Sequence, residues 1–367
     1  MRILMLNYEF PPLGGGASPV SYEIAKGYVK LGHSVDVVTM SYKNLPKYEV
    51  VDGINVYRVP CLRSKKEICH PHEMFSYIIS AKRFLKEHMK KNKYDINHTH
   101  FIIPTGYIAL WLKKNYQLPY IVTSHGSDVI GYNKRFKYFY PFLINNWKRI
   151  IKEAKYVTTP SKFLQNEIKR HTDEGSFVVI PNGIDKNKFK PMKKEKKILI
   201  VSRLFENKGV QDIIEALSDN ELREELEKED WKVTIVGDGP YGSYLKSLAK
   251  QKNLNDIVTF KGWLNNNSKE IKELYGRSKI FISASYFESF GLTLLEAISA
   301  GCYSLVSNIE GYREILRDNR YFFETKNIDD LKSKIKILIN EKNIKKIRIS
   351  NQFHWSIIIN KYLGVLR

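Results

Sequence analysis

The sequence predicts an α/β protein built from two domains, each containing a mostly parallel sheet. A chain of 367 residues that is 43% hydrophobic can form two cores and is too long for one ordinary domain. Short, β-rich apolar runs alternate with longer helical patterns, which is typical of βαβ units. This alternation stops at a basic stretch, residues 190–197, and then starts again.

Thirteen apolar runs predict the strands in chain order. The first seven lie at 2–8, 34–40, 54–60, 95–100, 119–125, 155–160 and 176–182, and the other six at 198–204, 231–239, 257–262, 279–285, 302–308 and 321–324. We expect the basic stretch to be a solvated linker, which gives domains at 1–190 and 196–350. Two doubly wound domains place the loops at their strand ends facing each other across a cleft, so the functional residues are expected in those loops.

Charge and cysteine content narrow the class of protein. The formal net charge of +21 favours anionic partners, namely nucleotides, phospholipid headgroups or nucleic acid, without choosing among them. The three cysteines (Cys61, Cys69 and Cys302) make no disulfide framework, and the first apolar run is too short for a signal peptide or a membrane span. We therefore expect a cytoplasmic protein. His70 and His72 follow Cys69, but this spacing fits no zinc pattern and predicts a polar loop.

Two strand-end loops of the first half contain candidate functional residues. Gly14, Gly15 and Gly16 lie between a predicted strand and a predicted helix, where bare backbone and helix N-terminal amides can approach an anion. An ordinary flexible turn would show the same triplet, and the G-x-G-x-x-G spacing is absent. His125 and Asp128 follow the strand at 119–125, and their side chains are expected to project into the cleft, although such a histidine is often structural.

The second half has cations at its first strand end. Arg203 and Lys208 suit a pyrophosphate, because arginine offers a bidentate fork and lysine a point charge. Gly237, and the pair Gly262 and Trp263, lie in turns after the next two strands. These turns have room for a flat base.

The stretch "ESFGLTLLE" contains two glutamates eight positions apart, Glu288 and Glu296. On one continuous helix they would be about 12 Å apart along the axis, too far to share a proton. They are therefore predicted to contact two parts of one long ligand. Phe290, Gly291 and Leu292 lie where a helix opens, so their amides are expected to face a diphosphate. Glu296 would then accept hydrogen bonds from a ribose, and Glu288 would face the group beyond the phosphates.

These elements resemble the retaining glycosyltransferases of family four, which have the GT-B fold of two facing Rossmann-like domains. The matching elements are "GGG" at 14–16, "HGSD" at 125–128, "PNGID" at 181–185, "SRLFENKG" at 202–209, "GDGP" at 237–240 and "ESFGLTLLEAISAG" at 288–301. The segment 353–363 resembles the last helix of the family, which crosses back to the first domain, so residues 351–367 are assigned with 1–190. The chain departs from the usual family sequence at three places: "GRSK", Ala284 with Ser285, and "GCYSLVSN". These departures leave the identity of the donor open.

The resemblance implies transfer of a hexose from a UDP- or GDP-linked sugar to an acceptor hydroxyl, with retention of configuration. It implies catalytic roles for His125, which positions the sugar or acceptor, and for Arg203, Lys208 and Glu288. No cofactor is expected, and no metal, because the chain lacks an Asp-x-Asp motif. The implied donor-binding residues are Gly15, Gly16, Arg203, Lys208, Gly237, Gly262, Trp263, Glu288, Phe290, Gly291, Leu292 and Glu296.

Two other classes of protein share some of these features. A GT-B sugar-nucleotide epimerase would bind the same donor, but the acid and base residues expected of it are not matched here. A nucleic-acid-binding protein is compatible with the charge, but the basic residues are dispersed and no such motif is present. Basic and aromatic residues interleave at 82–93 and 132–150, which favours a lipid-linked acceptor and docking of the first domain on the anionic cytoplasmic face of a membrane. Alternatively, the same aromatic residues belong to the hydrophobic core of the first domain.

Overall fold

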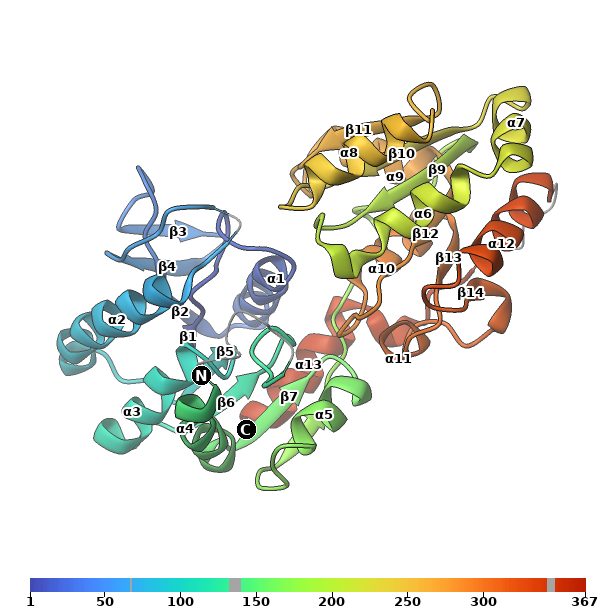
Figure 1. Cartoon of the computed structure of the whole chain (residues 1–367). Coiled ribbons are helices and arrows are strands. Elements are labelled where there is room, and N and C mark those ends of the chain that lie inside the picture. Colours follow the sequence, from blue (N-terminus) through green and yellow to red (C-terminus); the bar gives the residue numbers. More distant parts are fainter. Residues whose placement is uncertain (67, 132–139, 342–346) are drawn as a thin grey trace. The chain divides into compact units, whose positions relative to one another are not determined.

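The computed structural model describes residues 1–66, 68–131, 140–341 and 347–367, and the chain divides into two compact units (Figure 1). The first unit comprises Met1–Gly183 together with Gln352–Arg367, and the second comprises Ile184–Asn351. Each unit is a sheet with helices packed on it, which is the predicted α/β class. Within the described ranges, no helix is both long and apolar enough to cross a membrane.

The first unit contains an eight-stranded sheet with the order β3-β4-β2-β1-β5-β6-β7-β8. The strands are β1 (Arg2–Leu6), β2 (Ser34–Met40), β3 (Tyr48–Val51), β4 (Ile54–Val59), β5 (Ile96–His100), β6 (Tyr120–Thr123), β7 (Tyr156–Thr159) and β8 (Phe177–Val179). All seven predicted strands are present and parallel. The edge strand β3, antiparallel to β4, was not predicted. Its four residues are exposed or half-buried, so they lack the apolar run that identifies a buried strand.

Helices cover the sheet of the first unit. They are α1 (Ala17–Lys30), α2 (Pro71–Lys91), α3 (Thr105–Tyr116), α4 (Tyr140–Glu153), α5 (Lys162–Lys169) and the C-terminal α13 (Trp355–Leu366). Helix α13 packs against α1, as expected for a last helix that returns to the first domain. Gly27 of α1 permits this contact, because a Cβ there would come within 2.4 Å of the Ile359 side chain.

The second unit has a six-stranded, fully parallel sheet with the order β11-β10-β9-β12-β13-β14. The strands are β9 (Glu195–Val201), β10 (Lys232–Val236), β11 (Val258–Gly262), β12 (Ser278–Ser283), β13 (Tyr303–Ser307) and β14 (Phe322–Phe323). The helices are α6 (Val210–Leu217), α7 (Asn220–Lys228), α8 (Gly242–Gln251), α9 (Lys269–Arg277), α10 (Leu292–Ser299), α11 (Glu310–Arg313) and α12 (Ile328–Asn340). Each of the six strands overlaps a predicted run.

The basic stretch 190–197 is mostly exposed, as its composition predicts, but it is not the linker between the units. The boundary between the units lies before it, and the chain that follows the boundary packs on the second unit. Phe189 is buried with its ring centroid 5.0 Å from that of Tyr275, and Lys194 Nζ donates to the Ala300 carbonyl at 2.7 Å. This lysine satisfies a helix C-terminal carbonyl, so its charge is used within the fold.

Candidate functional site

Four loops of the second unit meet at the carboxyl edge of its sheet. They follow β11, β10, β9 and β12, which are neighbours in the sheet order (Figure 1). Backbone hydrogen bonds join them: Gly237 N donates to Gly262 O at 2.8 Å, Leu204 N donates to Asp238 O at 2.9 Å, and Tyr286 N donates to Asn207 O at 3.0 Å. The predicted donor loops of this domain therefore form one connected surface.

The glycines of these loops have two different roles. A Cβ on Gly237 would lie 1.8 Å from Ser202 O, and one on Gly209 would lie 2.0 Å from Ala284 O. Both glycines are therefore required where one loop crosses another. Gly262, in contrast, has a φ of +69° and nothing near its missing side chain. Of the two predicted base-binding turns, the one after β11 leaves open space, and the exposed Trp263 follows it directly.

Lys208 and Glu288 come together although they are far apart in the sequence. Lys208 Nζ lies 2.5 Å from Glu288 Oε1, and Ser285 Oγ donates to the same oxygen at 3.0 Å. Both charged side chains are mostly buried. The sequence predicted separate roles for the two residues, on the diphosphate and beyond it, but it did not predict their contact. A ligand phosphate at this site would share the Lys208 ammonium with a carboxylate.

Tyr286 ties the loop that carries Glu288 to the chain on both sides of Lys208. Its amide donates to Asn207 O at 3.0 Å, its hydroxyl donates to Asp212 Oδ1 at 3.0 Å, and Gln211 Nε2 donates to that hydroxyl at 2.7 Å. Burial, together with the hydrogen bond to Asp212, raises the pKa of Tyr286 to about 12. Sequence reasoning missed this tether, since no local pattern links positions more than 70 residues apart.

Glu296 lies in the second turn of α10, the helix that begins directly after Gly291. It is only 9% exposed. Oε1 accepts a hydrogen bond from Asn266 Nδ2 at 2.9 Å, and Oε2 accepts one from the Tyr275 hydroxyl at 2.9 Å. Burial raises the pKa of Glu296, and these two donors and the charge of Lys188 oppose that shift. Neither Asn266 nor Tyr275 was predicted as part of the site, yet together they fix the carboxylate.

The other predicted donor-binding residues of this unit differ in how far they are buried. Arg203 is exposed, with its guanidinium carbon 5.4 Å from the ring centroid of Phe205. The Phe290 side chain is buried, so it contributes packing, and Leu292 is half-buried. Gly291 has a φ of +100°, a conformation that favours glycine, and precedes the first turn of α10.

In the first unit, His125 follows β6 as predicted and is held by other aromatic rings. Its Nε2 lies 3.0 Å from His100 Nδ1, and its ring centroid lies 4.8 Å from that of Phe101. Burial lowers the pKa of His125 to about 3. The imidazole is therefore neutral near pH 7 and only weakly basic, which suits a positioning role better than that of a general base.

His125 ends a row of three histidines that runs into the core. The centroids of His98 and His100 are 4.4 Å apart, and both rings are fully buried. His98 uses both nitrogens, with Nδ1 at 3.0 Å from the Tyr28 hydroxyl and Nε2 at 2.8 Å from Thr123 Oγ1. The strand prediction included His98 and His100, but their packing against His125 was not predicted.

The expected projection of Asp128 into a cleft is wrong. Its side chain is turned into its own loop and is mostly buried. Oδ1 accepts hydrogen bonds from the backbone amides of His125 and Gly126 at 3.1 and 3.0 Å, and Oδ2 accepts one from the Ile102 amide at 2.7 Å. Asp128 therefore shapes the loop that holds His125.

The glycine triplet lies between β1 and α1 as predicted. Gly16 immediately precedes α1, and Gly14 has a φ of +89°. A Cβ on Gly14 would come within 2.6 Å of the Glu9 side chain, so this glycine is required by packing. Gly15 is half-buried and Gly16 exposed, and these two were the residues predicted to bind the donor.

The cysteine and histidine stretch forms no metal cluster in the part of the chain that the structure describes, where no three His, Cys, Asp or Glu side chains are grouped to hold an ion. His70 precedes α2, and its amide donates to Glu73 Oε2 at 2.8 Å. The Cys69 thiol is buried 3.9 Å from the Met40 sulfur.

Two family models match the two halves of the chain and overlap at residues 182–188. Residues 14–188 match the model described as Glycosyltransferase Family 4, and residues 182–355 match Glycosyl transferases group 1. The two parallel-sheet units, with these matches, define a glycosyltransferase of the GT-B fold. The chain belongs to glycosyltransferase family four.

Individual relatives and structures agree with this assignment. The chain is 28% identical to an uncharacterized glycosyltransferase of Methanocaldococcus jannaschii, over 100% of this chain and 98% of the relative. It is also 28% identical to the alpha-monoglucosyldiacylglycerol synthase of Streptococcus pneumoniae, over 82% of this chain and 70% of that protein. Among solved structures, the sucrose-phosphate synthase of Thermosynechococcus elongatus has the same fold, with a TM-score of 0.83, 18% identity, and coverage of 99% of this chain and 98% of that one.

Proposed function

We propose that the protein is a retaining hexosyltransferase that uses a nucleoside diphosphate sugar. The observation that supports this function is the contact of Lys208 with Glu288, and of Glu296 with Asn266, on the loops and the following helix at one carboxyl edge of a parallel sheet. Such an edge is the usual ligand site of α/β sheets. Glu296 receives the ribose hydroxyls, and Lys208, Arg203 and the start of α10 receive the diphosphate. Glu288 faces the sugar.

The chemistry requires stabilisation of a leaving diphosphate. The bond between the anomeric carbon and the phosphate oxygen breaks, and the acceptor oxygen bonds to the same face of that carbon. The acceptor proton passes to the departing phosphate. Negative charge gathers on the diphosphate in the transition state, and preorganised cations favour that state most. Lys208 and Arg203 supply the positive charge that stabilises the diphosphate, without a metal or a cofactor. His125 positions the sugar or acceptor.

A lipid-linked acceptor at an anionic membrane surface is the acceptor class that we propose. The net charge of +21 favours such a surface. The name of the streptococcal relative, a monoglucosyldiacylglycerol synthase, gives independent support. This acceptor places the enzyme at the cytoplasmic face of the membrane.

Thermal unfolding with a panel of donors tests the proposed function. UDP-glucose, GDP-mannose, UDP-GlcNAc and UDP-galactose are each added to the protein, with ATP as the control nucleotide. A ligand present at about 100 times its Kd stabilises a protein by about 2.7 kcal/mol, so the correct donor will raise Tm. The proposal fails if no sugar nucleotide raises Tm more than ATP does and none is turned over.

Metal removal is expected to leave activity unchanged, because side-chain cations and helix amides carry the stabilisation of the diphosphate. Transfer or donor hydrolysis is measured after dialysis against EDTA, and again with Mg²⁺ or Mn²⁺ restored. Activity lost on chelation and regained with either ion would show that the cationic loop does not suffice.

Glu296→Gln and Glu288→Gln are expected to act on different steps. Glu296→Gln weakens binding of the free nucleoside diphosphate by about tenfold, the cost of one hydrogen bond to a charged group. Glu288→Gln changes this affinity by about twofold or less and lowers kcat instead. Calorimetry with UDP and GDP, followed by turnover assays, separates the two effects. Glu215→Gln, which removes a charge paired with Lys252, is the control. The reverse order of effects would reject both assignments.

A further inference from the structure

Exposed apolar side chains gather at the beginning of α2 in the first unit. Phe75 and Ile79 are 64% and 50% exposed, and Leu62 is 61% exposed. Phe75 and Ile79 are four residues apart and so lie on the same face of the helix. Leu62 lies beside them, because its amide donates to Ser76 Oγ at 2.9 Å. Large apolar side chains exposed as a group, unlike single ones, mark an interaction surface.

Attachment of α2 to its own sheet does not account for these residues. The opposite face of the helix already provides fully buried Tyr77, Ala81 and Leu85. Tyr77 also donates its hydroxyl proton to the Val38 carbonyl at 2.8 Å. The helix is therefore anchored without Phe75 or Ile79.

The same helical face continues into a row of cations. Arg83, Lys86 and Lys90 follow Ile79 at intervals of four, three and four residues, and all three are exposed. From Phe75 to Lys90 the row extends about 22 Å along the helix axis. We call the apolar residues Leu62, Phe75 and Ile79 and the cations Arg83, Lys86 and Lys90 the α2 patch.

The acidic residues of α2 itself do little to neutralise the patch. Helix α2 contains five Lys and Arg residues and two glutamates. One of these, Glu73, is buried and accepts hydrogen bonds from the backbone amides of His70 and Ser64. The other, Glu87, lies 2.8 Å from Lys90 Nζ. Arg83 and Lys86 remain to face an anionic partner.

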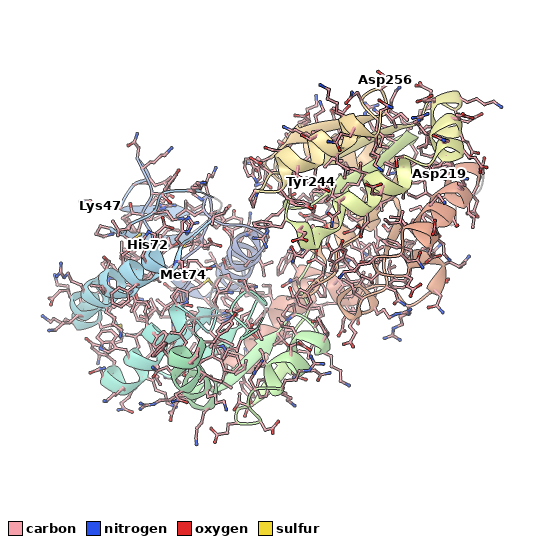
Figure 2. All side chains as sticks on the ribbon, in the orientation of Figure 1. Lys47, His72, Met74, Asp219, Tyr244 and Asp256 are labelled. Atoms are coloured by element: carbon pink, nitrogen blue, oxygen red, sulfur yellow. The ribbon has the colours of Figure 1, made fainter. Side chains whose placement is uncertain are left out.

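The edge strand β3 has exposed apolar side chains of its own. Tyr48 and Val50 of this strand are exposed. The ring centroid of Tyr48 lies 5.0 Å from that of Tyr57, and Tyr57 lies 5.4 Å from Phe84 of α2. Figure 2 labels Lys47, just before β3, together with His72 and Met74 of the first turn of α2, on this part of the first unit. Phe84 is nine positions after Phe75 and so lies on another face of the helix, and β3 is therefore not counted in the α2 patch.

We infer that the α2 patch docks the protein on a bilayer that contains anionic lipid. Apolar side chains next to cations fit the membrane interface, where the former enter the acyl boundary and the latter meet lipid phosphates. A purely ionic partner would leave Phe75, Ile79 and Leu62 without a function. The inference rests on the proposed function, because docking brings the enzyme to a surface that holds a lipid-linked acceptor.

This surface is distinct from the stretch 132–150 that the sequence favoured. Lys134, Arg135 and Lys137 of that stretch lie outside the described residues. The α2 patch needs none of them, and its apolar members were not singled out by the sequence. The sequence also favoured 82–93 as a membrane contact, and that stretch contains the cations of the α2 patch but none of its apolar residues.

Vesicle flotation of the full chain tests the inference. Vesicles of phosphatidylcholine, with or without phosphatidylglycerol, are mixed with the wild type and two variants, Phe75→Ser with Ile79→Ser, and Arg83→Gln with Lys86→Gln. The wild type is expected to float with anionic vesicles, and more weakly as salt is added. Each double variant is expected to lower the partition coefficient about tenfold or more.

Matched controls come from the second unit. Ile337→Ser removes an equally exposed apolar residue of α12, which is 62% exposed. Lys246→Gln with Lys250→Gln removes two exposed cations, four residues apart, from α8. Both control proteins are expected to float like the wild type, and all variants are expected to keep the Tm of the wild type.

Three outcomes would overturn the inference. The wild type could fail to float with anionic vesicles, or the α2 variants could float as well as their controls. Alternatively, sedimentation without lipid could reveal a dimer that Phe75→Ser with Ile79→Ser abolishes while no protein floats, which would assign the patch to a second copy. Flotation requires no donor or acceptor, so failure of the proposed transfer reaction would not be mistaken for failure of docking.

Discussion

Replacing Lys208 with alanine is expected to lower kcat by about 10²- to 10³-fold, the usual cost of losing one preorganised group that stabilises transition-state charge. Lys208 is mostly buried and lies 2.5 Å from Glu288 Oε1. Its removal takes a cation from the leaving diphosphate and leaves the Glu288 carboxylate uncompensated beside it. Both changes disfavour departure of an anion.

Lys196→Ala is the matched control for this experiment. Lys196 is also in the second unit, and its Nζ lies 2.9 Å from Glu229 Oε2, but that pair is exposed. Exposed pairs contribute little, so turnover by Lys196→Ala should equal that of the wild type. Turnover of the wild-type order by Lys208→Ala, with its fold confirmed by thermal unfolding, would remove Lys208 from the mechanism.

The free energy of unfolding is expected to fall steeply as the pH drops below about 6.5, the ordinary pKa of histidine. Burial lowers the pKa values of His98 and His125 to about 3, and the charge on His125 also contributes at His98. Burial and the two neighbouring imidazoles lower the pKa of His100 as well. The unfolded chain therefore binds more protons than the folded one between these pKa values, and stability rises with pH throughout this window.

The size of this effect follows from the linkage relation. The slope for each such histidine approaches about 1.4 kcal/mol per pH unit well below 6.5, and integration gives a loss of about 3 kcal/mol for His98 and His125 together between pH 6.5 and 5.0. That loss is a large part of the stability of an ordinary domain. Urea unfolding of the full chain at a series of pH values, monitored by fluorescence, measures the slope.

His98→Gln separates titration from packing. Glutamine keeps hydrogen-bonding capacity next to Tyr28 and Thr123 but binds no proton. The variant is expected to be less stable than the wild type at pH 7.5, and its stability should vary less with pH, by about 1.4 kcal/mol per unit. An unchanged slope would show that His98 does not carry the acid sensitivity.

The parallel strands were predictable because their signal is local. A buried parallel strand reads as a continuous apolar run, and thirteen such runs became thirteen strands of the two sheets. The exposed edge strand β3 has no such run and was missed. The stretch 190–197 was misassigned because a lysine looks the same in sequence whether its ammonium meets water or, like that of Lys194, the carbonyl of Ala300.

The site was predictable to the level of loops but not of contacts. Parallel topology alone places strand-end residues together, so Lys208, Glu288 and Gly262 were expected at one edge. The partners of Glu296 could not be inferred, because Asn266 is one of three consecutive asparagines and Tyr275 resembles any core residue of a helix. The same limit explains Asp128, whose backbone partners depend on a loop conformation that no sequence pattern specifies.

The anomeric configuration of the first product tests the central claim most directly. The donor that raises Tm is incubated with the enzyme and a lipid-linked or simple glycosyl acceptor, and the anomeric proton of the new linkage is followed by NMR from the earliest times. The sugar nucleotides named above are α-linked, so transfer with retention will give an α-linked product at a rate that Lys208→Ala lowers by about 10²-fold or more. A β-linked product, or an α-linked product formed equally fast by Lys208→Ala, would contradict the account.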